Sequence, residues 1–373
     1  MRITTPTLLL DKEKAKNNIR RMAAKAIRNS VRLRPHFKTH QSAQVGEWFR
    51  EAGVEAITVS SVRMARYFAN HGWKDIMIAF PVNVLEMDSI NELAAQVKLH
   101  LVAVNQDTIE VLADQLQHPV HLSLKIDTGY RRTGILATNY AELDKILQRV
   151  QVLGEKLHFE GFVVHDGHTY KQSDVYAIQT INNTSVYQLH QLRERYKAKF
   201  PNLQLSIGDT PSCSIIETLS GVDEIRPGNY VFYDLTQQRI GSCSFDEIAV
   251  CMACPVVAIH PERGEIILYG GSVHFSKDVL LQEDGTAVYG RVVDFTSNGW
   301  SAPLEGIQVV SLSQEHGVVK ASPEQLKKYK IGDLMGILPV HSCLTSNLMQ
   351  GYMTTEGEHL EHLSGLPKRE LVS

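Results

Sequence analysis

The sequence has no long hydrophobic run. Its start, MRITTPTLLLD, contains one basic residue and only three consecutive leucines before Asp11. A signal peptide needs a longer apolar core behind a basic segment, and a membrane-spanning helix needs about 20 apolar residues. We therefore expect a cytoplasmic protein with no membrane segment.

The chain also lacks an excess of charge of either sign. Its 373 residues carry a formal net charge of −3, and 21% of them are charged. Proteins that bind nucleic acid or anionic membranes are usually strongly basic over some part of their surface. We therefore expect neither kind of partner.

Cysteine is scarce, with five residues in the whole chain. An odd number without a secretion signal indicates free thiols or metal ligands rather than a disulfide framework. Cys251 and Cys254 form a CxxC, which is typical of zinc or redox pairs. However, they lie in the strand-like run EIAVCMACPVVAI, where positions three apart point to opposite faces. We interpret them as buried structural cysteines.

One basic stretch, VRLRPHFKTH, alternates with the period of a β-strand. One face carries Val31, Leu33, Pro35 and Phe37, and the other carries Arg32, Arg34, His36, Lys38 and His40. A lysine crowded by other cations loses basicity, and a partly neutral amine can hold the aldehyde of pyridoxal phosphate. Lys38 is therefore a candidate for cofactor binding. The alternative is an edge strand whose basic face meets water.

Eight apolar runs, mostly separated by helical patterns, indicate parallel strands that close into a barrel. A (β/α)8 barrel needs about 250 residues. The predicted fold class is α/β, with a (β/α)8 barrel of the TIM type over residues 11–240 and a smaller, mainly β domain over residues 241–373, joined by residues 1–10. The eight predicted strands are 31–37, 56–60, 76–80, 99–104, 120–126, 159–164, 203–207 and 222–225.

Polar residues and glycines follow most of these strands, where barrel enzymes place their active sites. Turns that contain Gly208 and Gly228 follow the seventh and eighth strands, where barrels often hold a phosphate on backbone amides. These strands lie beside the Lys38 strand once the barrel closes. A lysine next to a phosphate-binding turn fits a site for pyridoxal phosphate.

A metal site is predicted in the second domain. PVHSC continues an apolar run, and if the strand extends through it, His341 and Cys343 lie on one face with their Cα atoms about 6 to 7 Å apart. Imidazole and thiolate suit a zinc ion that keeps open positions. The alternative is a chance HxC pattern. Glu315 and His316 form a second cluster that could face the same site.

The whole chain resembles the metal-activated branch of the fold-type III pyridoxal phosphate enzymes, which are related to alanine racemase and include D-serine dehydratases and D-threonine aldolases. The resemblance rests on TPTLLLD, RPHFKTH, KIDTGYRRTG, HDGH, IGDTPS, RPGNYVFYD, SQEHG and PVHSCLTSNL, in this order. The resemblance implies that Lys38 holds the cofactor, that His341 and Cys343 bind zinc, and that His316 is catalytic. Further cofactor contacts implied in this way are Arg132, His165, Tyr170, Gly208, Asp209, Thr210, Arg226, Gly228, Asn229 and Tyr230.

Asp209 departs from the related motif, which usually has a small hydroxyl residue. A carboxylate repels a phosphate, so we expect the Asp209 side chain to turn away. The HxC form resembles the dehydratases, whereas the aldolases tend toward HxD. The expected activity is dehydration and deamination of D-serine or another D-3-hydroxy amino acid. The alternatives are aldol cleavage to glycine and an aldehyde, racemization, and a non-catalytic cofactor carrier. The resemblance also implies a homodimer.

Overall fold

The computed structural model describes residues 3–363, which form two compact units. The barrel unit comprises residues 21–38 and 49–228, and the β unit comprises residues 3–20, 39–48 and 229–363. The boundary expected from the sequence at residue 240 stays a prediction. Within residues 3–363, no helix has the length and apolar character needed to cross a membrane.

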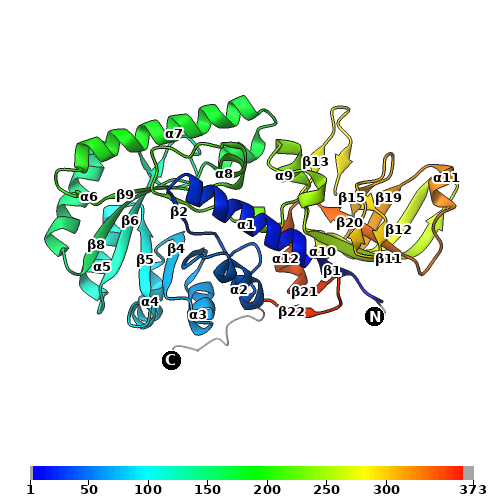
Figure 1. Cartoon of the computed structure of the whole chain (residues 1–373), viewed down its shortest axis with the longest axis horizontal. Coiled ribbons are helices and arrows are strands. Elements are labelled where there is room, and N and C mark those ends of the chain that lie inside the picture. The colour runs from blue at the N-terminus through cyan, green and yellow to red at the C-terminus, as the bar shows by residue number, and fades with distance from the viewer. Residues whose placement is uncertain (1–2, 364–373) are drawn as a thin grey trace. The chain divides into compact units, whose positions relative to one another are not determined.

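Eight parallel strands form the barrel unit, as predicted, and helices cover their outer side (Figure 1). Within residues 3–363, a single isolated bridge, between His36 and Thr58, joins the two ends of the strand order. A short strand, β7 (Ile135–Leu136), pairs with β6 outside this order. The strands in spatial order are β2 (Arg32–Leu33), β10 (Glu224–Ile225), β9 (Gln204–Ile207), β8 (Leu157–Val163), β6 (Val120–Asp127), β5 (Lys98–Ala103), β4 (Asp75–Pro81) and β3 (Ala56–Val59).

The basic stretch is not the long strand that its alternation predicts. Its regular part, β2, covers two residues, and Arg34 is only 1% exposed. Arg34 lies between two carboxylates, Glu224 at 2.6 Å from its Nε and Asp75 at its Nη1. Arg34 therefore does not meet water, because acidic partners from neighbouring strands take up its charge, whereas Arg32 and Lys38 on the same face are exposed.

Three helices of this region begin at polar residues that closely follow strands. Ser61, Asn105 and Asp209 each accept a hydrogen bond from the backbone N–H three residues later. Such caps satisfy N–H groups that a helix start leaves unpaired, so part of the polarity after the strands is structural. The helices are α1 (Lys12–Arg28), α2 (Ala43–Glu51), α3 (Val62–Asn70), α4 (Met87–Ala94), α5 (Gln106–Gln115), α6 (Tyr140–Leu153), α7 (Val175–Tyr196) and α8 (Thr210–Ile215).

The β unit contains a closed antiparallel barrel, confirming the mainly β second domain. Its strands run in the order β12, β19, β18, β15, β20 and β11, and β11 pairs again with β12. β1 (Thr7–Leu10) pairs with β11 and leads to β21 (Gly351–Thr354) and β22 (His359–Glu361). The barrel strands are β11 (Val250–His260), β12 (Glu265–Tyr269), β15 (Gly290–Val293), β18 (Gln308–Leu312), β19 (His316–Lys320) and β20 (Leu334–Pro339).

Cys251 and Cys254 lie on β11, and both are fully buried free cysteines, as predicted.

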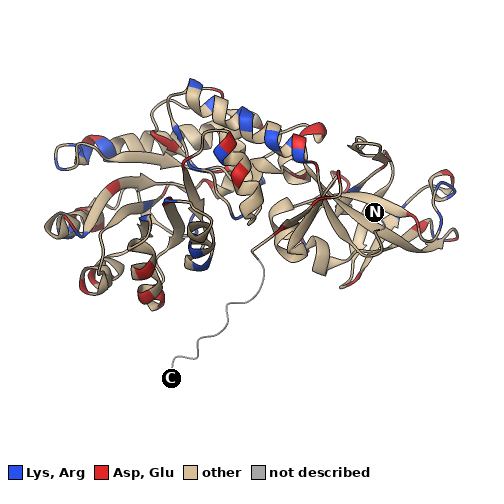
Figure 2. Ribbon diagram, turned by 60° about the horizontal axis from the view of Figure 1, so that its bottom comes forward, with Lys and Arg blue, Asp and Glu red and all other residues tan. Residues whose placement is uncertain are grey.

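Basic and acidic residues are mixed along the helices around the parallel strands (Figure 2). Short elements complete the β unit: α9 (Leu235–Ile240), α10 (Ser272–Phe275), α11 (Pro323–Leu326), α12 (Ser342–Met349), and the strand pairs β13 (Leu280–Leu281) with β14 (Ala287–Val288) and β16 (Phe295–Thr296) with β17 (Gly299–Trp300).

Candidate active site

Lys38 lies at the carboxyl end of the barrel, just after the residues that close it. Phe37, next to it, is fully buried, and its ring packs within about 5 Å of Phe49, Phe68 and Trp73. Phe37 N–H donates to Thr58 O at 2.9 Å. The backbone that carries Lys38 is therefore held by core packing and by the closing bridge.

A cluster of basic groups surrounds this position. Burial, followed by the charge of Lys38, lowers the pKa of His165 to about 3, so its ring is neutral at pH 7. The same two causes, in the same order, lower the pKa of His36 well below its usual value. The His165 ring also contacts Gly208 O through Nδ1. The charge of Lys38 thus helps to keep two nearby imidazoles neutral.

Lys125 is a member of this cluster that the sequence analysis missed. It lies on β6 and is 8% exposed. Burial, and then the positive charges of Arg132, Arg226 and Lys38, lower its pKa to about 8. The loss of basicity expected for Lys38, as an amine surrounded by cations, therefore applies to Lys125. The available signal was a lysine within the apolar strand pattern VHLSLKID.

The two arginines predicted at the site, Arg226 and Arg132, differ in burial and in the groups that they contact. Arg226 is 8% exposed, and its guanidinium donates to Val164 O at 2.7 Å and to Ser206 Oγ. Arg132 is exposed, and its guanidinium lies 4.9 Å from the ring centre of Tyr130. The roles of these arginines toward a cofactor remain predictions.

The start of α8 gathers the predicted phosphate contacts. A Cβ at position 208 would lie 2.9 Å from Arg226 Cβ, so glycine allows the close approach of these two segments. Thr210 N–H donates to Tyr170 Oη at 3.1 Å. The hydroxyls of Thr210 and Ser212 are fully buried and have no hydrogen-bond partner within the described residues. Two unsatisfied donors beside a backbone turn fit a phosphate group.

Asp209 directs its side chain into the protein, and the expected turn away from a phosphate stays a prediction. Its Oδ1 accepts hydrogen bonds from Ser212 N–H at 2.7 Å and from Thr169 Oγ1 at 3.0 Å. Burial and the nearby Asp166 raise the pKa of Asp209 above the usual carboxyl range. The carboxyl group therefore caps α8 and carries less negative charge than an exposed aspartate.

The predicted metal ligands lie at the start of a helix and not on a strand. β20 ends at Pro339, His341 is the N-cap residue of α12, and Cys343 is in its first turn. The expected alternation is therefore wrong, although the two residues still interact. Burial opposes protonation of the His341 ring, but hydrogen bonds to Asp278 and Cys343 raise its pKa above the usual histidine value.

Asp278 was not predicted, and its Oδ2 lies 2.7 Å from His341 Nδ1. A carboxylate on one ring nitrogen commonly orients a metal-binding histidine and leaves the other nitrogen for the ion. Cys343 Sγ lies 3.2 Å from Thr39 Oγ1 and 3.5 Å from Asn229 Nδ2. The imidazole, the thiol and the orienting carboxylate form a donor set that fits zinc.

Asn229 and His316 also belong to the β unit. Asn229 Nδ2 donates to Asp234 Oδ2 at 2.6 Å and to Ser342 Oγ at 3.0 Å, so its amide supports the turn before α12. Tyr230 is fully buried beside it. His316 is the first residue of β19, opposite Tyr269 on β12. The catalytic role of His316 remains a prediction.

Two family models match the chain. The alanine racemase N-terminal domain matches residues 10–235, and a serine dehydratase domain matches residues 249–355. The D-serine dehydratase of Dictyostelium discoideum is 30% identical over 94% of this chain and 93% of that protein. The D-threonine aldolase of an Arthrobacter species is 24% identical over 97% of this chain and 92% of that protein.

A solved structure is also similar over nearly the whole chain. The D-threo-3-hydroxyaspartate dehydratase from Delftia sp. HT23 has a TM-score of 0.89 and 26% identity, with 98% of each chain covered. A cysteine-to-alanine mutant of that enzyme was solved in a metal-free form and has the same TM-score of 0.89.

Proposed function

Because this chain belongs to the alanine racemase-like family of pyridoxal phosphate enzymes that includes the D-serine dehydratases, we propose that it dehydrates D-3-hydroxy amino acids. D-Serine would yield pyruvate and ammonia, and D-threonine or a D-3-hydroxyaspartate would yield the matching oxo acids. The observation that carries this proposal is the Asp278, His341 and Cys343 donor set. Such a set can bind the metal ion that a poor leaving group such as hydroxide requires.

Pyridoxal phosphate fits the residues at the carboxyl end of the barrel. The amine of Lys38 would bind its aldehyde, and the unsatisfied hydroxyls of Thr210 and Ser212 would donate to its phosphate. When bound, this cofactor supplies an electron sink for the charge that develops on the substrate α-carbon. The neutral ring of His165 and the guanidinium of Arg132 would orient the cofactor, and the other predicted contacts are Tyr170, Gly208, Arg226, Gly228, Asn229 and Tyr230.

Zinc is the metal that we propose for His341 and Cys343. Thiolate ligation favours zinc over magnesium or calcium. When bound, the ion stabilises negative charge on the 3-hydroxyl oxygen of the substrate. Asp278 holds the His341 ring through Nδ1, so Nε2 is the nitrogen available to the ion.

Lys38 has the central role among the chain's own residues. Its Nζ would take the α-proton of the substrate. The 3-hydroxyl group then leaves as water, and hydrolysis releases ammonia and the oxo acid. His316 is the further candidate for proton transfer.

The products of the reaction test this proposal. The holoenzyme would be incubated with D-serine, D-threonine and both D-3-hydroxyaspartate diastereomers, with and without a chelator. Pyruvate and ammonia from D-serine, with turnover lost on chelation and restored by zinc, support metal-assisted dehydration. Glycine and acetaldehyde from D-threonine would instead establish aldol cleavage, as in the aldolase relative. Interconversion of enantiomers without ammonia would establish racemization.

We further propose a cytoplasmic homodimer, as the family resemblance implies. Light scattering coupled to size-exclusion chromatography gives the mass in solution. A mass near 84 kDa, twice the 41.8 kDa of one chain, is expected.

A further inference from the structure

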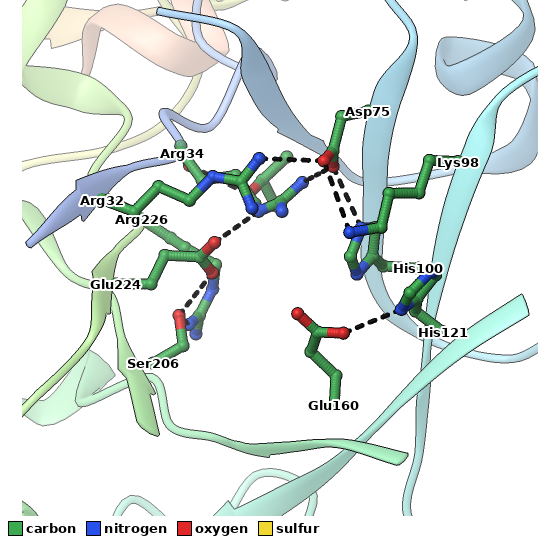
Figure 3. A network of polar contacts seen from close by, with 11 residues as sticks. Arg32, Arg34, Asp75, Lys98, His100, His121, Glu160, Ser206, Glu224 and Arg226 are labelled. Carbon is green, nitrogen blue, oxygen red and sulfur yellow. Dashed lines mark hydrogen bonds and ion pairs between the residues drawn. The ribbon is translucent and has the colours of Figure 1, made fainter. Parts of the chain in front are cut away.

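A second group of metal-binding side chains lies at the opposite end of the barrel from Lys38. His100 and His121 lie near the amino ends of β5 and β6, and Glu160 lies in the middle of β8. Their candidate ligand atoms all lie within 4.8 Å of one another. Figure 3 shows Glu160 and the two imidazoles facing one another. We call these three residues the amino-end cluster.

The strand register explains why the two histidines meet. His100 and His121 are directly paired on the parallel strands β5 and β6. Paired residues of adjacent strands point to the same face. Their rings stack with centroids 4.7 Å apart and an interplanar angle of 27°.

A β-bulge directs Glu160 toward the histidines. Leu122 of β6 pairs with Phe159, but the next residue, Ser123, pairs with Gly161, so Glu160 is the extra residue. Gly161 has φ of +147°, and a Cβ there would lie 1.9 Å from Gln204 O. Only glycine fits, and a bulge re-aims the side chain of the extra residue. The backbone of β8 is thus built to place this carboxylate.

His100 has the arrangement of a metal-binding histidine. It is fully buried, and its Nε2 lies 3.0 Å from Asp75 Oδ1. Neither of its ring nitrogens forms a hydrogen bond within residues 3–363, although Nε2 lies close to Asp75. A carboxylate beside one ring nitrogen, with the other nitrogen left for an ion, is the usual outer support of a histidine ligand.

The charges nearby leave one carboxylate without a cationic partner. Arg34 lies between Asp75 and Glu224 and balances part of their charge. Glu160 pairs with His121 Nδ1 at 2.8 Å, and within the described residues it forms no ion pair with a lysine or arginine. Glu160 therefore offers a carboxylate oxygen beside two imidazoles.

A small cavity adjoins the cluster and gives room for further ligands. Its volume is about 40 Å³, and its lining mixes polar side chains, including His100, Glu160 and Ser206, with apolar ones, including Met77 and Phe162. A cavity of this size has room for a water molecule beside the polar groups. Zinc sites with three protein ligands complete their coordination with water.

We propose that His100, His121 and Glu160 bind a divalent transition-metal ion, with zinc as the best match, at the amino end of the barrel. The ligands would be His100 Nδ1, one ring nitrogen of His121 and a carboxylate oxygen of Glu160. The ion takes the place of the proton that His121 and Glu160 share, so binding releases that proton. The site joins β5, β6 and β8, and it is separate from the His341 and Cys343 site.

Metal stoichiometry tests this site without using activity. The holoenzyme would be stripped with a chelator, titrated with Co²⁺ or Zn²⁺, and analysed by elemental mass spectrometry and absorption. We expect His121→Gln and Glu160→Gln each to bind one ion per chain fewer than the wild type, or to bind it at least ten-fold more weakly. His118→Gln changes a histidine outside the cluster and should keep the wild-type stoichiometry.

Cobalt absorption separates the two metal sites. Cys343→Ala should lose any thiolate-to-cobalt charge-transfer band and still bind one Co²⁺ per chain through imidazole and carboxylate. His121 and Glu160 are both partly exposed, so their glutamine variants should fold, which circular dichroism would check. Equal stoichiometry in the wild type, His121→Gln and Glu160→Gln would overturn the proposal, as would Cys343→Ala protein that binds no cobalt. Either result would leave the proposed lyase activity untouched.

Discussion

Asp278 Oδ2 lies 2.7 Å from His341 Nδ1 and so determines which nitrogen of the imidazole ring is left for a metal ion. Replacing such an outer carboxylate commonly lowers metal affinity about 10- to 100-fold. Asp278→Asn should therefore bind zinc more weakly by this factor and lose turnover in metal-poor buffer. Added zinc should restore it. Asp284→Asn changes an exposed carboxylate and serves as the matched control. Unchanged zinc affinity in Asp278→Asn would mean that this pair is only structural.

Lys38→Ala should abolish covalent attachment of the cofactor. Borohydride reduction followed by mass spectrometry should find pyridoxyl-lysine at residue 38 in the wild type and none in the variant. Since the same amine is proposed to take the α-proton, turnover should fall by about 10²- to 10⁴-fold. Lys156→Ala removes a lysine whose amine donates to Ala113 O and should behave as wild type. Labelling of Lys125 in the wild type would move the assignment to that residue.

Thr210→Val should weaken cofactor binding. The buried Thr210 hydroxyl has no partner within the described residues, and its hydrogen bond to a charged phosphate would contribute about 1.5 to 3 kcal/mol. The dissociation constant of the cofactor should rise about 10- to 100-fold. Fluorescence titration of the stripped protein measures it. Thr180→Val removes a hydroxyl that bonds only within α7, and it should leave the affinity unchanged.

Lys125 should make the cofactor-free protein more stable as the pH rises above 8. Its pKa is about 8 in the folded protein and near 10.5 when unfolded. Between these values the unfolded chain binds more protons, so the free energy of unfolding rises with pH across this window. Lys125→Met removes the cost of a buried charge and should be more stable than wild type by up to about 3 kcal/mol at pH 7.

This advantage of Lys125→Met should shrink toward pH 10, as urea unfolding at several pH values would show. Lys156→Met is the control, because its amine is on a more exposed part of the barrel unit. A stability difference that does not change between pH 7 and pH 10 would contradict the assigned titration.

Arg34→Met should strongly destabilise the barrel unit. Removing the 1% exposed guanidinium leaves Asp75 and Glu224 without their shared partner. Breaking a buried ion pair on one side costs about 3 to 5 kcal/mol. Arg32→Met removes a neighbour that is 42% exposed and should cost about 1 kcal/mol or less. Urea unfolding compares the two variants, and similar losses would show that burial of Arg34 has little effect.

The barrel strands could be predicted because their apolar runs and the helical patterns between them have clear periods. The run predicted at 76–80 is β4 (Asp75–Pro81), and the run at 120–126 is β6. Helix α1 was also predictable, since Asp11 caps its start by accepting from Lys14 N–H at 3.0 Å. In these segments, local signals and the final packing agree.

Other features depend on contacts that local pattern does not contain. The apolar run through Val340 predicts a strand, but Asp234, 108 residues earlier, accepts the N–H of Ser342 and helps fix the turn that starts α12. The cations that lower the pKa of Lys125 come from other strands and loops of the barrel. Asp278 likewise lies 63 residues before its partner His341. The positions of these side chains therefore depend on partners that lie far along the chain.

The two ends of the barrel's strand order meet beside Lys38, and this has a consequence for biosynthesis. Residues 32–36 hydrogen-bond on one side to residues 223–227, and on the other side the segment 35–37 hydrogen-bonds to Thr58. During translation, the lysine emerges from the ribosome almost two hundred residues before its far neighbour. A nascent chain stopped before Glu224 should thus be unable to capture the cofactor, however long it waits.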